Sequence, residues 1–277
     1  MQSSFGEKPP SSFDPNEKIK HNEIQKRSSH REPKETPLPL VDGFRAISCL
    51  RRLDISGNKI TINMAAVLYD YFSQACNLSD VNIARCSLNE TTSSRILLGF
   101  ANGGGGDTLL KMDARDNQII LSSQEFCGIL QQFSQLKYLN LSGNRCEEMK
   151  ELRHKSFCQC LSQLSSLKAL SLSCIKLSAV AGKVLLTISS HMRLMVLDMS
   201  NCFLSSDCEP DIIKLLTRTT SLEFIMMHGF LWAADKPKDQ QMQKGDNTRT
   251  CIEKIAKDKN INLIFDGHYE GIDITYC

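Results

Sequence analysis

The sequence predicts an α/β fold in which short parallel strands and helices alternate along one continuous stack. Three observations support this prediction. An eleven-residue pattern rich in leucine recurs along the chain, its copies are nearly evenly spaced, and helix-forming segments lie between them. Because one strand and one helix cannot bury their own apolar faces, we expect successive units to stack and to share a continuous core.

The pattern is clearest in the segment LKYLNLSGNRC, which begins at Leu136. Apolar residues occupy its first, fourth and sixth positions, which is typical of a strand with one buried face. The other copies begin at Leu50, Leu78, Leu109, Leu167, Leu194, Leu222 and, in degenerate form, Ile261. Successive copies start 27 to 31 residues apart, except that the last follows at 39. We therefore predict strands near residues 52–56, 80–84, 111–115, 138–142, 169–173, 196–200, 224–228 and 262–266.

The ninth position of the pattern carries asparagine or cysteine in five of the seven clear copies. These residues are Asn58, Cys86, Asn117, Asn144 and Cys202. The chain is expected to turn at this point, and a polar side chain there can bind backbone groups that the turn leaves unpaired. Ile175 and Phe230, which occupy the same position in the other two copies, cannot do so.

The pattern as a whole resembles L-x-x-L-x-L-x-x-N/C-x-L, the leucine-rich repeat, and units of about 28 residues resemble its ribonuclease-inhibitor-like subtype. The resemblance implies a leucine-rich-repeat solenoid, or horseshoe, with a parallel inner β-sheet and outer helices. It assigns residues 41–277 to one domain of seven or eight repeats. It implies little about function, because a fold does not determine function.

Helices are expected between the strands, in the segments 61–77, 122–135, 155–164, 179–190, 209–219 and 251–260. Residues 122–125 (SSQE) match a capping box, and Pro210 suits the first turn of a helix. The glycine-rich segment 101–108 is predicted to be a flexible loop, because it lacks the Lys-Ser/Thr pair of a phosphate-binding loop. Residues 233–250 are predicted to form an exposed polar insertion.

Both ends of the chain differ from the repeats. Residues 1–40 contain six of the eight prolines together with much serine and charge, so we predict a disordered tail there. The segment 39–49 is interpreted either as an amino-terminal cap or as the remnant of a longer repeat protein. Residues 268–277 are interpreted as a further edge strand, which would serve as a cap or as a docking edge.

The charge and cysteine content argue against several classes of protein. A net charge of +2 gives no reason to expect binding to nucleic acid. Several of the twelve cysteines occupy core positions of the repeat, as small buried hydrophobic residues do. Neither a secretory leader nor an apolar stretch of about 18 residues is evident, so we predict no membrane span. We expect a cytoplasmic protein, with the nucleus as the alternative.

The sequence offers no arrangement of residues that is typical of catalysis. Its six histidines are scattered, and Cys158 and Cys160 form a C-x-C pair without a second pair. We therefore predict no catalytic residues, no metal ligands and no cofactor, and we expect that the protein is not an enzyme.

Candidate partner-binding residues lie at the third, fifth and seventh positions, whose side chains are expected to point away from the core. They are Arg52, Asp80, Lys111, Arg115, Tyr138, Phe224, Met226 and His228, with Trp232 nearby. The first units carry charges of both signs, whereas the last units are apolar and include Val196, Leu263 and Phe265. Tyr138, flanked by Lys111 and Arg115, is the best single candidate for a binding hot spot. The apolar end is predicted to be covered either by a partner or by the segments 233–250 or 268–277.

These patterns predict a non-catalytic, monomeric scaffold or adaptor that binds a protein partner through the concave face of the repeats. The resemblance keeps three alternatives open, namely a cytoskeletal regulator of actin assembly, the repeat region of an innate-immune sensor, and a host-targeting effector. An inhibitor of a basic ribonuclease is less consistent with the near-neutral charge, since a basic enzyme favours an acidic inhibitor.

Overall fold

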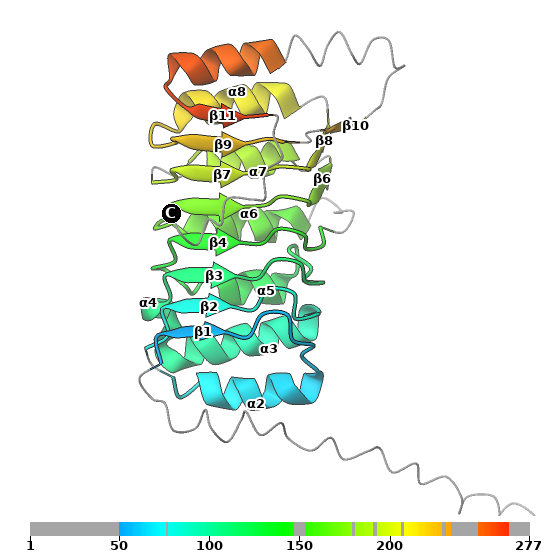
Figure 1. Ribbon diagram of the computed structural model, residues 1–277, viewed down its shortest axis with the longest axis vertical. Helices are drawn as coiled ribbons and strands as arrows, with labels where there is room; N and C mark the ends of the chain where they lie inside the picture. Colours follow the sequence, from blue (N-terminus) through cyan, green and yellow to red (C-terminus); the bar gives the residue numbers. More distant parts are fainter. Residues whose placement is uncertain are drawn as a thin grey trace, which may run out of the picture. The chain divides into compact units, whose positions relative to one another are not determined.

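Eight of the described strands form one parallel sheet in the computed structural model of this chain (Figure 1). They are β1 (Arg52–Asp54), β2 (Asp80–Asn82), β3 (Lys111–Asp113), β4 (Tyr138–Asn140), β5 (Ala169–Ser171), β7 (Val196–Asp198), β9 (Phe224–Met226) and β11 (Asn262–Ile264). Their order in the sheet follows their order in the chain. The predicted α/β class, with a parallel sheet and helices, is therefore confirmed.

The structure describes residues 50–75, 77–146, 153–178, 181–190, 193–205, 208–228, 231–233 and 249–265. All of them belong to the unit Pro39–Cys277. Several predicted features lie outside the described residues: the tail 1–40, the segment 39–49, Phe230, most of the insertion 233–250 and the edge strand 268–277.

The strands pair in a constant register from β1 to β9. Their third-position residues form one row, which runs Arg52, Asp80, Lys111, Tyr138, Ala169, Val196 and Phe224. Each strand has three residues and not the five predicted, because the chain turns at the seventh and eighth positions. In six units the eighth residue has a left-handed φ of 54° to 74°; these residues are Gly57, Arg85, Asp116, Gly143, Cys174 and Asn201.

The last strand differs from the prediction by one residue. β11 pairs Ile264 with Met226, so Ile264 belongs to the face that points away from the core. The prediction that Leu263 and Phe265 lie on that face is therefore wrong, and both pack against the main core. The reason is that Ile261 directly precedes its strand, whereas the leucine of each earlier copy lies two residues before its strand. A shift of one residue moves every side chain of a strand to the other face.

Helices lie along one face of the eight-stranded sheet in the described part of the chain (Figure 1). They are α2 (Ile62–Phe72), α3 (Glu90–Phe100), α5 (Gln124–Leu130), α6 (Arg153–Gln163), α7 (Ala181–Ile188) and α8 (Glu209–Arg218). Residues 249–258 are also helical. Neighbouring helices in this series pack against one another, so each unit adds a strand to the sheet and, in most units, a helix to the outer layer.

The ends of three helices test the predicted caps. Pro210 lies in the first turn of α8, as predicted. The capping box predicted for residues 122–125 is wrong by one residue, because Ser123 is the N-cap and its hydroxyl accepts from the backbone N–H of Phe126 at 3.3 Å. The sequence does not predict α3, whose first turns are rich in threonine and serine. A capping box between Asn89 and Thr92 starts this helix.

The glycine-rich segment is helical, so the prediction of a flexible loop at 101–108 is wrong. The stretch η2 (Ala101–Gly105) continues α3, is kinked at Gly104 and leads into α4 (Gly106–Thr108). Gly104 reverses the local geometry with a φ of 91°, which favours glycine. A side chain at Gly103 would overlap the carbonyl oxygen of Phe72, at the end of α2. The glycines therefore permit two helices to approach each other closely.

Three of the turns lead into a second, smaller parallel sheet. Its strands are β6 (Lys176–Ser178), β8 (Phe203–Ser205) and β10 (Leu231–Ala233), paired in the order β10-β8-β6. Ile175, whose side chain cannot hydrogen-bond the turn, is completely buried and directly precedes β6. Pairing between backbone strands therefore gives these units a further connection, both after Ile175 and after Cys202, whose thiol also bonds the preceding unit.

The main hydrophobic core lies between the sheet and the helices. Leu136, Leu139 and Leu141 of the clearest copy are completely buried. Burial of one leucine side chain contributes about 1.5–3 kcal/mol to stability. Because every unit repeats these contacts, the core runs continuously from Leu53 to Ile261.

Candidate functional site

The helices lie on one side of the sheet (Figure 1), and we call the other side the open face. Side chains at the third and fifth positions lie on the open face. The fourth-position side chains between them belong to the main core. The open face therefore presents two parallel rows of side chains, one from each position.

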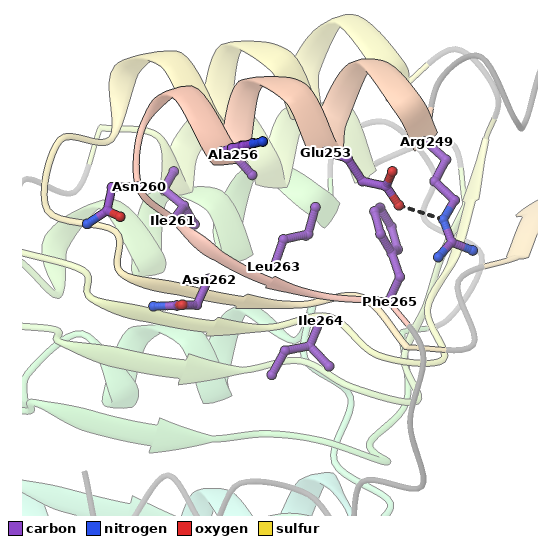
Figure 2. Close-up of a pocket in the computed structure, with 10 residues that line it drawn as sticks. Arg249, Glu253, Ala256, Asn260, Ile261, Asn262, Leu263, Ile264 and Phe265 are labelled. Carbon is purple, nitrogen blue, oxygen red and sulfur yellow. Dashed lines mark hydrogen bonds and ion pairs between the residues drawn. The ribbon is translucent and has the colours of Figure 1, made fainter.

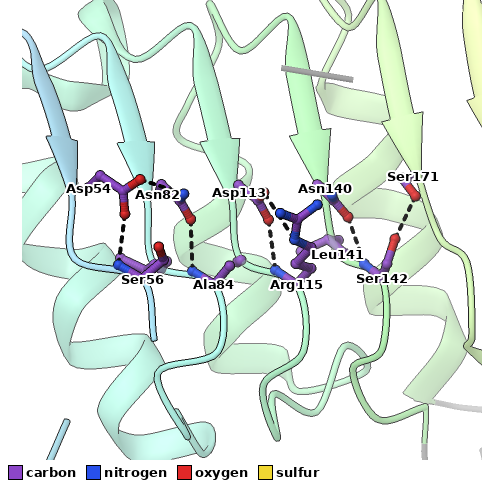
Figure 3. Close-up of polar contacts among 12 residues, drawn as sticks. Asp54, Ser56, Asn82, Ala84, Asp113, Arg115, Asn140, Leu141, Ser142 and Ser171 are labelled. Carbon is purple, nitrogen blue, oxygen red and sulfur yellow. Dashed lines mark hydrogen bonds and ion pairs between the residues drawn. The ribbon is translucent and has the colours of Figure 1, made fainter. Parts of the chain in front are cut away.

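The fifth-position row is built from turns closed by aspartate and asparagine (Figure 3). In each case a side-chain oxygen accepts a hydrogen bond from the backbone N–H two residues later. The pairs are Asp54 with Ser56 (2.8 Å), Asn82 with Ala84 (3.1 Å), Asp113 with Arg115 (3.1 Å), Asn140 with Ser142 (3.1 Å) and Asp198 with Ser200 (2.9 Å). Aspartate and asparagine therefore have a structural role in this row. Where the strand ends, their side-chain oxygen takes the place of a backbone acceptor.

Further hydrogen bonds run sideways between neighbouring units. The Asn82 amide nitrogen donates to Asp54 Oδ2 at 2.9 Å, and the Ser171 hydroxyl donates to Asp198 Oδ2 at 2.8 Å. The hydroxyls of Ser142 and Ser171 are also hydrogen-bonded to each other. The hydroxyl and backbone N–H of Ser56, together with the Asn82 amide, hold the pKa of Asp54 below its ordinary value.

The third-position row begins with charged residues that are paired. Arg52 Nε lies 2.9 Å from Asp80 Oδ2 in the next strand, although the Arg52 side chain is 84% exposed. The ammonium group of Lys111 lies over the ring of Tyr138, 4.6 Å from its centroid. Arg115 does not repeat this contact, because its Nε lies 3.5 Å from Asp113 Oδ2 in its own unit. Of the two predicted flanking residues, the cation that contacts Tyr138 is therefore Lys111.

The second half of the open face carries a cluster of apolar side chains that is separate from the main core. We call it the open-face apolar cluster. Its members are Ala169, Val196 and Met226, with Tyr138, Met195, Phe224 and Ile264 packed against them. The first three are only 1%, 6% and 2% exposed. Five neighbouring strands, β4 to β11, contribute to this cluster.

The structure thus brings together three of the predicted partner-binding residues, Tyr138, Phe224 and Met226. The sequence prediction leaves out Ala169, Met195 and Ile264. The register of the pattern already places Ala169 at a third position, on the face away from the core, but Ala169 was not among the candidate partner-binding residues.

Two other predicted residues lie elsewhere. Trp232 lies in β10, which belongs to the second sheet and not to the eight-stranded one. His228 follows β9 in the turn, where its backbone carbonyl accepts from the N–H of Asn201 at 2.6 Å. Residues that are close in sequence to the cluster are thus separated from it by the turn after the strand.

The ninth-position side chains join successive units through buried hydrogen bonds. The amide nitrogen of Asn117 donates to the carbonyl oxygens of Ile83 (2.9 Å) and Ala114 (3.0 Å), which belong to two successive units. Its amide oxygen accepts from the backbone N–H groups of Cys86 and Leu88, both at 3.0 Å. One side chain therefore holds two neighbouring turns together.

The other ninth-position residues make related bonds. Three reach a carbonyl oxygen of the preceding unit: Asn144 to Ala114 (2.9 Å), Cys86 to Ile55 (3.1 Å) and Cys202 to Leu172 (3.0 Å). Asn58, in the first described unit, donates to the Ile55 carbonyl oxygen at 2.8 Å. Burial raises the pKa of the Cys86 thiol, and it raises the pKa of Cys202 to about 12. These thiols therefore stay protonated and act as structural hydrogen-bond donors.

A pocket of about 660 Å³ lies between residues 249–258 and β11 (Figure 2). Arg249 and Glu253 form an ion pair of 2.8 Å on its wall, and the Arg249 guanidinium lies 4.9 Å from the ring centroid of Phe265. Both charged side chains are nearly half exposed, so water screens the pair. The pocket marks the end of the described stack, and Lys257 is a second cation of its lining beside the Arg249–Glu253 pair.

Two general features bear on the kind of site that is present. Among the residues that the structure describes, no group of three or more His, Cys, Asp or Glu side chains could hold a metal ion. The same residues include no helix that is long and apolar enough to cross a membrane.

Comparison with models of known protein families finds no match to this sequence. Comparison with curated proteins finds no match either. The residues of the open face therefore carry the functional argument.

Proposed function

We propose that this chain is a non-catalytic leucine-rich-repeat solenoid of the ribonuclease-inhibitor-like subtype, which binds a protein partner through the open face of its sheet. The observation that carries the proposal is the open-face apolar cluster. Aromatic and methionine side chains gather there on the face opposite the helices, where the main core does not need them. Side chains of this kind are enriched where proteins bind proteins.

The repeat interpretation is supported by the way each unit is attached to the next. Consecutive units add consecutive strands to the sheet at a spacing of 27 to 31 residues over most of the chain. Ninth-position side chains such as Asn117 and Asn144 bind the backbone of the preceding unit. A solenoid is the architecture in which each unit contacts mainly its neighbours.

A protein suits the open face better than a nucleic acid does. Binding to nucleic acid depends on cations that are available to phosphate groups. On this face Arg52 is paired with Asp80, and Arg115 with Asp113. The charged half would instead form a polar rim beside an apolar centre, as in protein interfaces.

A binding role also accounts for the acidic side chains of the face without catalysis. Asp54, Asp113 and Asp198 each accept a hydrogen bond from a turn N–H of their own unit. Their carboxylates are therefore committed to structure.

The test compares the full-length chain with two double variants in a quantitative capture from cell extract. Tyr138→Ala with Phe224→Ala alters the open face. Ile62→Ala with Leu98→Ala is the matched control, because these apolar side chains are exposed on α2 and α3 at 44% and 37%. We expect the control to retain the captured partner and the open-face variant to lose at least about tenfold in affinity, as loss of a hot spot does. Retention of the partner by the open-face variant, with its thermal unfolding unchanged, would refute the proposed surface.

A further inference from the structure

We propose that residues 266–277 of the same chain dock on the open-face apolar cluster, so that a partner must displace this segment in order to bind. The docking is inferred from the burial of the open face, the position of the segment and its residue types. The competition between this segment and a partner rests on the proposed function.

The first observation is the burial of this face. Ala169, Val196 and Met226 are 1%, 6% and 2% exposed, although the described helices all lie on the other side of the sheet (Figure 1). The polar neighbours Asp113 and Asp198 are just as deeply buried, at 3% and 6%. A sheet face without a covering layer is normally in contact with water. Deep burial of side chains on a face without a described covering layer is what a further segment of chain docked there would produce.

The second observation is where the described chain ends. Ile264, the last residue of β11, is itself packed against the cluster, and residues 266–277 follow directly after Phe265. Twelve extended residues span up to about 40 Å. The cluster extends over five strands, which at a spacing of ~4.8 Å is about 19 Å across. The segment therefore starts at the cluster and is long enough to cross it.

The third observation is the chemistry of the segment. Ile272, Ile274 and Tyr276 alternate with polar residues, so an extended chain would present all three on one side. Its acidic residues, such as Asp273, would find a cation in Lys111, which lies over Tyr138 at the charged end of the cluster. The residues between β10 and the last helical segment, 234–248, have no such alternation. The alternation and the acidic charge favour 266–277 as the occupant.

Oxidation of methionine side chains by hydroxyl radicals tests the docking in the full-length chain. Met226 and Met227 are adjacent and equally buried, but Met226 belongs to the open-face apolar cluster and Met227 to the main core. We expect Ile272→Asp with Ile274→Asp to raise the oxidation rate of Met226 about tenfold, because a charged segment would leave the apolar surface. The rate of Met227 should remain unchanged, which shows that the fold is intact.

The control variant is Met242→Asp, which places a similar charge in residues 234–248. If Met242→Asp exposes Met226 and the double variant does not, residues 234–248 are the cover and our proposal is wrong. Exposure of Met226 on dilution of the unaltered chain would identify a second copy as the cover, which also overturns it. If Met227 also becomes reactive in the Ile272→Asp, Ile274→Asp variant, that variant has lost its fold. The Ile272→Ala, Ile274→Ala variant then replaces it in the test, and the oxidation rates of Met226 and Met227 are compared in the same way.

The regulatory consequence has a separate readout. A partner that binds the open face should bind the Ile272→Asp, Ile274→Asp chain several-fold more tightly than the unaltered chain, because displacement no longer opposes binding. Equal affinities, together with a newly exposed Met226, would refute the regulation and leave the docking in place. If residues 266–277 dock but no partner binds the open face in any variant, the proposed function is refuted and the docking stands.

Discussion

Asn117 shows at the scale of one residue what the ninth position of a repeat does. At a buried turn, its amide group donates hydrogen bonds to backbone carbonyl oxygens of two successive units and accepts hydrogen bonds from backbone N–H groups. A buried polar group that loses its partner costs about 1–3 kcal/mol. Asn58 makes the same kind of bond to Ile55, but at an exposed turn, where water can take the place of the side chain.

The two asparagines should therefore respond differently to the same substitution. We expect Asn117→Ala to lower the free energy of unfolding by about 3 kcal/mol or more, since several buried groups lose their partner. We expect Asn58→Ala to lower it by about 1 kcal/mol or less. Urea denaturation followed by circular dichroism measures both values. Equal losses would contradict a role for the buried amide in joining units.

At the scale of elements, the contact between α2 and the α3–η2 segment depends on the absence of a side chain. Gly103 lies against the Phe72 carbonyl oxygen, and the rings of Phe72 and Phe100 pack with their centroids 4.1 Å apart. Gly128, in the middle of α5, has open space where its side chain would be. The same substitution should thus have opposite effects at the two positions.

We expect Gly103→Ala to lower the free energy of unfolding by about 2 kcal/mol or more, because the added methyl group must push the two helices apart. Gly128→Ala should raise it by about 0.5–1 kcal/mol, because alanine loses less conformational freedom in a helix than glycine does. Thermal denaturation of both variants checks the signs. A stabilised Gly103→Ala variant would show that the close helix approach is not required.

At the scale of the whole molecule, one continuous core connects units that are far apart in the sequence. Cys86 follows β2 and Cys202 follows β7, and both are completely buried in that core. Cys174, in contrast, is exposed. Only a thiolate reacts with an alkylating reagent, so burial together with a raised pKa protects the first two thiols.

We expect Cys174 to be alkylated rapidly in the native chain at pH 8, and Cys86 and Cys202 to react only as urea unfolds it. Because a shared core couples the units, both buried cysteines should become reactive at the same urea concentration. Mass spectrometry of alkylated peptides provides the measurement. Two well-separated midpoints would show that the ends of the stack unfold independently.

Much of the fold could be predicted because its signals are local. The leucine pattern predicts the first residue of each of the first seven strands of the eight-stranded sheet and orients their side chains, since alternation along a strand depends only on that strand. Tyr138, Phe224 and Met226 were identified as candidates for the same reason. The last strand was misplaced because its degenerate copy has a different distance between Ile261 and the strand.

The sequence by itself determined the repeat spacing, the parallel α/β class and the faces of the first seven strands of the sheet. Only the tertiary structure decided that the glycine run is helical, that Ile264 and not Leu263 faces away from the core, and that Trp232 belongs to a second sheet. It also decided that side chains from five strands meet in one apolar cluster. The physical reason is the range of the interactions. The hydrophobic period is a property of one short segment, whereas each of these outcomes depends on contacts between segments about 30 residues or more apart in the chain.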